Sequence, residues 1–115
     1  MKMDYHQICK NEEICLLIEK GNEILQELGY TEHSRKHAMK VAETAGKILK
    51  ELGYGKRKIE LAKIAGYMHD IGNSINRHDH AQSGAILAYQ ILKDLDFSYR
   101  DILVVTTAIG HHDEG

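Results

Sequence analysis

The sequence predicts an all-α domain, a compact bundle of about five to six helices. Proline, which breaks helices, is absent from all 115 residues. Apolar side chains recur at i, i+3, i+4 and i+7 along most of the chain, which places them on one face of a helix. No segment alternates apolar and polar residues as a strand would. The length fits a single domain over residues 1–115.

Composition and charge exclude several classes of protein. Hydrophobic residues make up 43% and charged residues 28% of the chain, the balance of a soluble folded domain. The net charge of −2 argues against a nucleic-acid partner, and no apolar run reaches the roughly 18 residues of a membrane span. The spacing of Cys9 and Cys15 matches neither a CxxC redox pair nor a zinc knuckle, which predicts free thiols. Because the N-terminus also lacks a signal-type apolar core, we expect a cytoplasmic protein.

Two helices are predicted first. One belongs to an N-terminal helical segment, residues 1–30, and ends at Gly29, which can adopt the left-handed cap conformation. Its apolar stripe comprises Ile14, Leu17, Ile18, Gly21, Ile24, Leu25 and Leu28. Thr31 is the expected N-cap of the next helix, which stops at Gly53–Gly55. The expected inner face of that helix comprises Ala38, Val41, Ala45, Ile48, Leu49 and Leu52.

Three further helices follow. The third runs from about Lys58 to near Gly72, and a polar loop, residues 73–78, comes after it. Asp79 and Gln82 resemble a capping box that starts the fourth helix, and Ser98 starts the fifth in the same way. The apolar positions of these last two helices are Ala85, Ala88, Ile91, Leu92, Ile102, Val105 and Ile109. Because the loops are short, neighbouring helices should pack antiparallel.

Four of the predicted helices each turn one histidine toward the interior: His37, His69, His80 and His112. His33 lies one helical turn before the first of them, and Asp70 follows the second. Neutral imidazoles and a carboxylate are ligands of divalent transition metals, and a buried carboxylate needs a cation as its partner. One metal site explains all four positions, whereas four hydrogen-bonded core histidines need four explanations. His6 and His78 are expected to be solvated.

Residues 31–115 contain four ordered pieces: His37–Ala42, Met68–Gly72, His80-x-x-x-Gly84-Ala85 and Ile109-x-x-His112. Together they resemble the HD-domain metal-dependent phosphohydrolase superfamily, in its two-metal, histidine-rich branch. The resemblance implies one or two divalent transition metals (Mn, Fe, Ni, Co or Zn). The ligands that it implies are His37, His69, Asp70, His80 and His112, with Asp70 able to bridge two metals. His111 and His33 are further candidates, because the cyclic-dinucleotide branch uses neighbouring histidines and a ligand one turn before the first.

One departure from the family pattern concerns the last ligand. In the family this ligand is an aspartate on a helix well beyond the position of His112, whereas this sequence ends at Gly115. We therefore expect that residues 31–115 form a metal-site core shortened at its C-terminus. The alternative is an incomplete site, in which this chain would be inactive.

The resemblance implies hydrolysis of a small phosphorylated substrate, a nucleotide-like phosphate ester or diester, by metal-activated water. Asp70 would be the catalytic carboxylate that orients the nucleophile. Arg77 and Lys40 are candidates for contacting the phosphate, because both lie near the histidines in the sequence. One alternative is an HD-type di-iron oxygenase. The other is a non-enzymatic helical module for metal binding or homodimerisation, with the first helix as the dimer surface.

Overall fold

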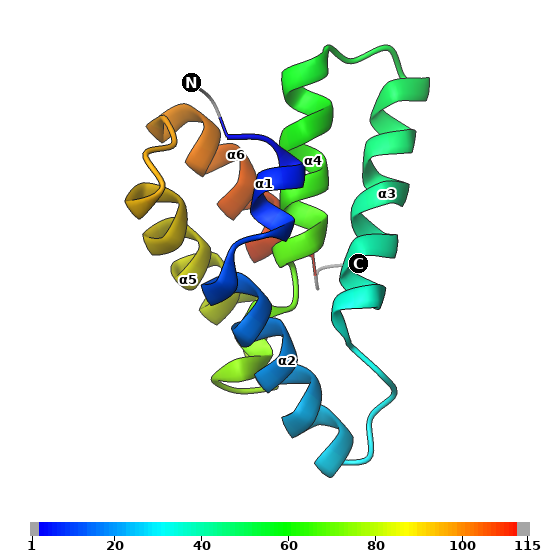
Figure 1. Ribbon diagram of the computed structural model, residues 1–115, viewed down its shortest axis with the longest axis vertical. Coiled ribbons are helices and arrows are strands. Elements are labelled where there is room, and N and C mark those ends of the chain that lie inside the picture. The colour runs from blue at the N-terminus through cyan, green and yellow to red at the C-terminus, as the bar shows by residue number, and fades with distance from the viewer. Residues whose placement is uncertain (1–2, 113–115) are drawn as a thin grey trace.

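The computed structural model describes residues 3–112, and over this range it consists of helices and loops without strands (Figure 1). The elements are α1 (Tyr5–Cys9), α2 (Glu12–Glu27), α3 (Arg35–Glu51), α4 (Lys56–Met68), the short 3₁₀ helix η1 (Ile71–Ser74), α5 (His80–Asp94) and α6 (Tyr99–Gly110). The molecule measures 40 × 30 × 26 Å. The prediction of an all-α bundle is confirmed.

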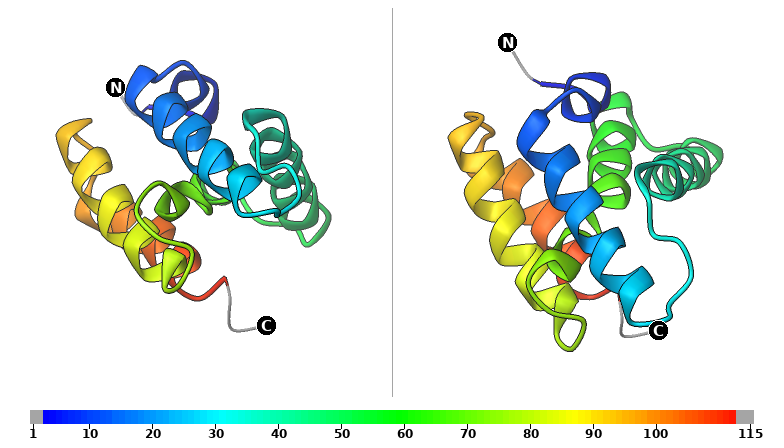
Figure 2. Two further views of the ribbon diagram at one scale, coloured as in Figure 1. Left: turned by 90° about the horizontal axis from the view of Figure 1, so that it is seen from below. Right: turned by 60° about the horizontal axis from the view of Figure 1, so that its bottom comes forward.

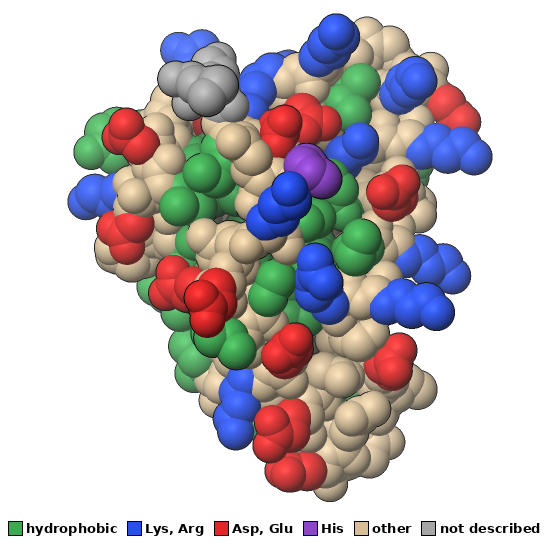
Figure 3. Space-filling model, in the orientation of Figure 1, with side chains coloured by type: hydrophobic (Ala, Val, Ile, Leu, Met, Phe, Trp, Pro, Cys, Tyr) green, Lys and Arg blue, Asp and Glu red, His purple; other side chains and the backbone are tan. Residues whose placement is uncertain are grey.

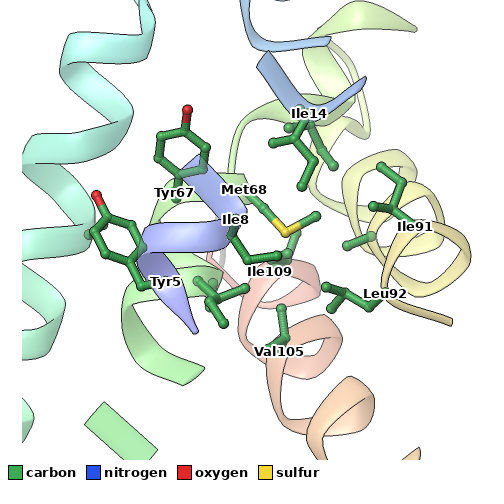
Figure 4. Packing of buried hydrophobic residues seen from close by; sticks show 14 of the residues in the cluster. Tyr5, Ile8, Ile14, Tyr67, Met68, Ile91, Leu92, Val105 and Ile109 are labelled. Atoms are coloured by element: carbon green, nitrogen blue, oxygen red, sulfur yellow. The ribbon is translucent and has the colours of Figure 1, made fainter. Parts of the chain in front are cut away.

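Two antiparallel hairpins, α3–α4 and α5–α6, form most of the bundle (Figures 1 and 2). Helix α4 packs against α6 and joins the hairpins, while α1 lies on α4 and α2 packs on η1. The core fills the space between α1, α2, α4, α5 and α6, where Met68 lies near Ile8, Ile14 and Ile109 (Figure 4). Helix α3 stands outside this core and contributes only small side chains to it.

The start and the inner face of α3 differ from the prediction. The helix begins at Arg35 rather than near Thr31, because Ser34 is the N-cap and its Oγ accepts the N–H of His37 at 3.4 Å. The expected inner residues Ile48 and Leu52 are 51% and 68% exposed. Ala38 is buried as predicted, but the buried row continues through Ala42 and Gly46.

Close packing explains the small residues of that row. A Cβ added to Gly66 of α4 would lie 2.9 Å from the Cα of Ala42, so the two backbones nearly touch. Only small side chains fit between helices at this distance, and the larger apolar residues of α3 lie at the rim of the contact. The left-handed cap expected after α2 is confirmed by a φ of 87° at Gly29. Gly53, where the next helix was expected to stop, also has a left-handed φ, 86°.

Most of the other differences from the predicted helices lie between α4 and α5. Helix α4 ends at Met68, and η1 occupies part of the expected polar loop and buries Asn73. The capping box expected at Asp79 is wrong, since this residue adopts φ 62° and its side chain makes no cap hydrogen bond. The Ser98 cap is confirmed by its Oγ, which accepts the Asp101 N–H at 3.2 Å. The short helix α1, which opens with a capping box at Asp4, was not predicted.

Candidate metal centre

The two hairpins bring their histidine-bearing ends together around Asp70. In an antiparallel hairpin the start of one helix lies beside the end of its partner, so the start of α3 meets the end of α4 and the start of α5 meets the end of α6. Five histidines therefore come from separate segments to one place: His33 (before α3), His37 (α3), His69 (after α4), His80 (α5) and His112 (after α6). Asp70 follows α4 and lies at the middle of this cluster.

The two carboxylate oxygens of Asp70 face different histidines. Oδ2 lies 2.9 Å from Nδ1 of His33 and 3.0 Å from Nε2 of His69. Oδ1 lies 3.4 Å from Nε2 of His80 and 3.7 Å from Nε2 of His112. The carboxylate thus has one oxygen for each side of the cluster, which is the geometry of a bridging ligand.

Two sets of side chains within the cluster have the spacing of metal ligands. The α3 group consists of His33, His37 and Asp70, and the α5–α6 group consists of Asp70, His80 and His112. In each group one ligand atom from every residue lies within 4.8 Å of the others. Because Asp70 belongs to both, the arrangement can hold two ions that share one carboxylate.

Backbone carbonyls fix the protonation of three of the rings. The Nδ1 atoms of His69, His80 and His112 lie 2.6, 3.0 and 2.6 Å from carbonyl oxygens three residues earlier in the chain. A carbonyl only accepts, so each Nδ1 donates its proton. Nε2 is then the metal-binding atom when the ring is neutral, and it can donate to a carboxylate when the ring is protonated. Nε2 of His80 and Nε2 of His112 lie 3.0 Å apart and so point to one place.

The charges of the apo cluster also suit a cation. Burial raises the pKa of Asp70, but hydrogen bonds from His112, His69 and His33 outweigh it and hold this pKa well below its ordinary value. Burial, with the neighbouring charges of His69 and His33, lowers the pKa of His37. At neutral pH Asp70 is therefore ionised and His37 is neutral, and metal ligation requires these two states.

Asn73 gives independent evidence that the cluster around Asp70 binds a ligand. Its side chain is 1% exposed and borders a small enclosed pocket that Asp70, His33 and His37 also line. Its Oδ1 accepts from Nη1 of Arg77 at 3.4 Å, while its Nδ2 has no partner among the described residues. An unpaired buried amide costs about 1–3 kcal/mol, and an oxygen ligand beside a bound cation would satisfy it. The residues present therefore fit a metal centre.

Asn73 is not among the residues predicted for the site, because residues 73–78 were expected to form a polar loop. The available signal was its spacing of three from Asp70, since residues i and i+3 of a 3₁₀ helix lie on one side. His33 and His37 were expected on one helix, but His33 precedes α3. The centres of the His33 and His37 rings nevertheless lie 5.2 Å apart.

The remaining predicted residues lie around the centre or outside it. Arg77 stacks on Tyr30, with its guanidinium carbon 5.0 Å from the ring centre, and Lys40 is exposed in a groove that His37 also lines. His111 is exposed, lines a groove between α5 and α6, and belongs to neither ligand group among the described residues. The two histidines expected to be solvated, His6 and His78, are exposed.

Fold and site together define a helical protein with a cluster of histidines around one aspartate that could hold metal ions. Residues 35–115 match the family model described as HD domain, and the chain belongs to this family. HD domains bind divalent metals and form a superfamily of metal-dependent phosphohydrolases.

A protein of Methanocaldococcus jannaschii that is described as uncharacterized is similar to this chain, with 31% identity over 91 residues. The match covers 66% of this chain, which spans 35% of the length of that relative. No solved structure matches the chain. Over residues 3–112, no helix is both long and apolar enough to span a membrane.

The stability of the metal-free protein should decrease as the pH falls below about 6.5. Because the pKa of His37 is lower in the folded state, the unfolded chain binds more protons in this range, and acidification favours unfolding. Melting temperatures measured in a chelator from pH 8 to pH 5 should decrease, and His37→Asn should reduce the decrease. The exposed His78→Ala serves as the control; an equal effect of both substitutions would contradict the assignment.

Proposed function

We propose that this protein is a metal-dependent phosphohydrolase that cleaves a small, nucleotide-like phosphate ester or diester with two divalent transition metals. The observation that carries the proposal is Asp70, whose two oxygens face two separate sets of ligands. Membership of the HD-domain family supports the same class of reaction. The metals would be held by His33, His37, His69, Asp70, His80 and His112.

The chemistry that bound divalent cations supply is polarisation of phosphoryl oxygens and a lowered pKa for a water that acts as the nucleophile. Asp70, ionised and held by its histidine neighbours, fixes the spacing of the two groups. The unpaired Nδ2 of Asn73 would donate a hydrogen bond to an oxygen of a ligand bound in the adjoining pocket. These side chains thus orient the nucleophile and the phosphoryl group relative to each other.

Lys and Arg side chains around the candidate metal centre suit an anionic substrate. Residues 35–68, which form the α3–α4 hairpin, contain nine Lys or Arg and three Asp or Glu, and basic side chains gather over these helices (Figure 3). Two of these residues, Lys36 and Lys40, belong to the first turns of α3 at the end that holds His37, where their positive charge attracts phosphates. Lys40 beside that histidine, and Arg77 beside Asn73, are placed to contact phosphate oxygens.

The test is hydrolysis of bis(p-nitrophenyl) phosphate and of a panel of nucleotides by the manganese-loaded chain. We expect activity that a chelator abolishes and that manganese restores. His80→Ala removes a ligand of the α5–α6 group and should lower kcat by roughly 100-fold or more. His78→Ala, an exposed histidine close by, should leave kcat unchanged.

Hydrolysis that persists in the chelator, or that His80→Ala leaves intact, would contradict the proposal. The di-iron oxygenase gains support if the iron-loaded chain consumes oxygen while the manganese-loaded chain hydrolyses none of the substrates. The non-enzymatic module gains support if metal binds at full stoichiometry and neither reaction occurs.

A further inference from the structure

Helix α3, which carries one half of the candidate metal centre, packs closely on α4 but has few contacts with any other helix. Helix α3 packs on α4 through small side chains, and its larger apolar residues are exposed. It carries His37, and the loop before it carries His33. The distance from these two histidines to Asp70 therefore depends on how the start of α3 is anchored.

Arg35, the first residue of α3, provides an anchor between the two histidines. Its Nε donates to the hydroxyl of Tyr67 at 2.9 Å, and its Nη2 donates to the backbone oxygen of Cys9 at 3.0 Å. Cys9 is the last residue of α1, so its carbonyl lies at the negative end of that helix. One guanidinium thus ties the start of α3 to both α1 and α4.

Tyr67 connects this anchor to the metal centre. It lies on α4 three residues before Asp70, is 1% exposed, and borders the same enclosed pocket as Asp70, His33 and His37. Its hydroxyl also lies 3.5 Å from the sulfur of Cys15 on α2. A hydroxyl held in this way has a fixed position relative to Asp70.

A second tether holds the same segment from the other side. The backbone N–H of His33 donates to Oδ1 of Asn22 on α2 at 2.7 Å. Ser34, the N-cap of α3, lies between this tether and the Arg35 anchor. Within residues 3–112 the imidazole of His37, by contrast, makes ring contacts with His33 and His69 and no hydrogen bond. The approach of His37 to Asp70 therefore depends on the packing of α3 on α4 and on Arg35, which ties the first turn of α3 to Tyr67.

We propose that Arg35 and Tyr67 form a positioning pair that controls metal binding at the α3 group. The hydrogen bond between them holds His33 and His37 close enough to Asp70 for that group to bind an ion. The α5–α6 group does not depend on this bond, because His80 and His112 are fixed by carbonyls of Arg77 and Ile109. The inference rests on the proposed two-metal centre.

The experiment is a cobalt(II) titration of the full chain, followed by visible absorption, with metal content measured after dialysis. Wild type should bind two equivalents. Tyr67→Phe removes only the hydroxyl and should keep one equivalent while the second binds at least 10-fold more weakly. The far-ultraviolet circular dichroism of the metal-free variant should match that of wild type.

The matched control is Tyr5→Phe. Tyr5 is the other buried tyrosine of this cluster, with its ring centre 5.9 Å from that of Tyr67, and its hydroxyl has no hydrogen-bond partner among the described residues. This variant should bind two equivalents with wild-type affinity. Loss of the second equivalent in Tyr5→Phe as well would show a general packing effect and overturn the proposal.

Arg35 gives a second pair of variants in case Tyr67→Phe fails to fold. Arg35 lies at the exposed start of its helix, so Arg35→Met should fold and lose the second equivalent, and Arg35→Lys should restore part of it. Two equivalents bound with wild-type affinity by Tyr67→Phe or Arg35→Met would overturn the proposal. A wild-type protein that binds fewer than two equivalents would refute the two-metal centre, and the pairing proposal with it.

Discussion

Replacing Asp70 with asparagine is expected to abolish metal binding at both ligand groups. The carboxylate is the only residue that the two groups share, and it supplies the one negative charge among their ligands. Asparagine retains the shape but not the charge, and only one of its two terminal atoms can coordinate a cation. Even the loss of a residue that supports a ligand costs 10–100-fold in metal affinity, so we expect a decrease of more than roughly 100-fold here.

Isothermal titration calorimetry with manganese or zinc would measure this loss. Asp79→Asn is the matched control, because Asp79 is an exposed aspartate in the same region, with its side chain 55% exposed. Its φ of 62° is one that asparagine also adopts readily, so this variant should fold and bind metal like wild type. An Asp70→Asn protein that still binds two ions would place the metals elsewhere.

The helices could be predicted from the sequence because their signals are local. Apolar periodicity locates α2, α4, α5 and α6, and Gly29 and Gly53 locate two of the helix ends. The inner face of α3 could not be predicted in this way. The apolar period of α3 fits an inner face with Ile48 and Leu52 as well as one with Ala42. Which of the two faces is buried depends on how closely α4 approaches α3. That distance is a property of the packed pair rather than of either helix.

The same distinction applies to the metal centre. The structure places His37, His69, His80 and His112 around Asp70, and their positions follow from the ends of antiparallel helices. The position of Asn73 beside Asp70 depends on η1, a single 3₁₀ turn. Such a turn is too short to show an apolar period, so the spacing of three between the two residues has meaning only once the turn is known. The Arg35–Tyr67 hydrogen bond joins residues 32 apart in sequence, and neither residue belongs to a motif.

Gly72→Ala is expected to have the largest effect on the stability of the fold. A Cβ at this position would overlap the carbonyl oxygen of His80 and lie 2.6 Å from the backbone nitrogen of Gly84. Both contacts are with the backbone of α5, which cannot rotate away as a side chain can. Helix α5 must therefore move, at a cost of about 3 kcal/mol or more. Thermal melts followed by circular dichroism should show a decrease of about 10 °C or more in Tm.

The displacement of α5 should also affect the metal centre, because His80 lies in the first turn of that helix and faces Asp70. We therefore expect Gly72→Ala to lose the ion of the α5–α6 group before that of the α3 group. Gly110→Ala is the matched control, since a Cβ there would meet Ala85 at an ordinary 3.7 Å. A helical glycine-to-alanine change of this kind is neutral or stabilises by up to about 1 kcal/mol. Equal Tm values for the two variants would show that α5 does not pack on η1 as closely as the backbone contact at Gly72 requires.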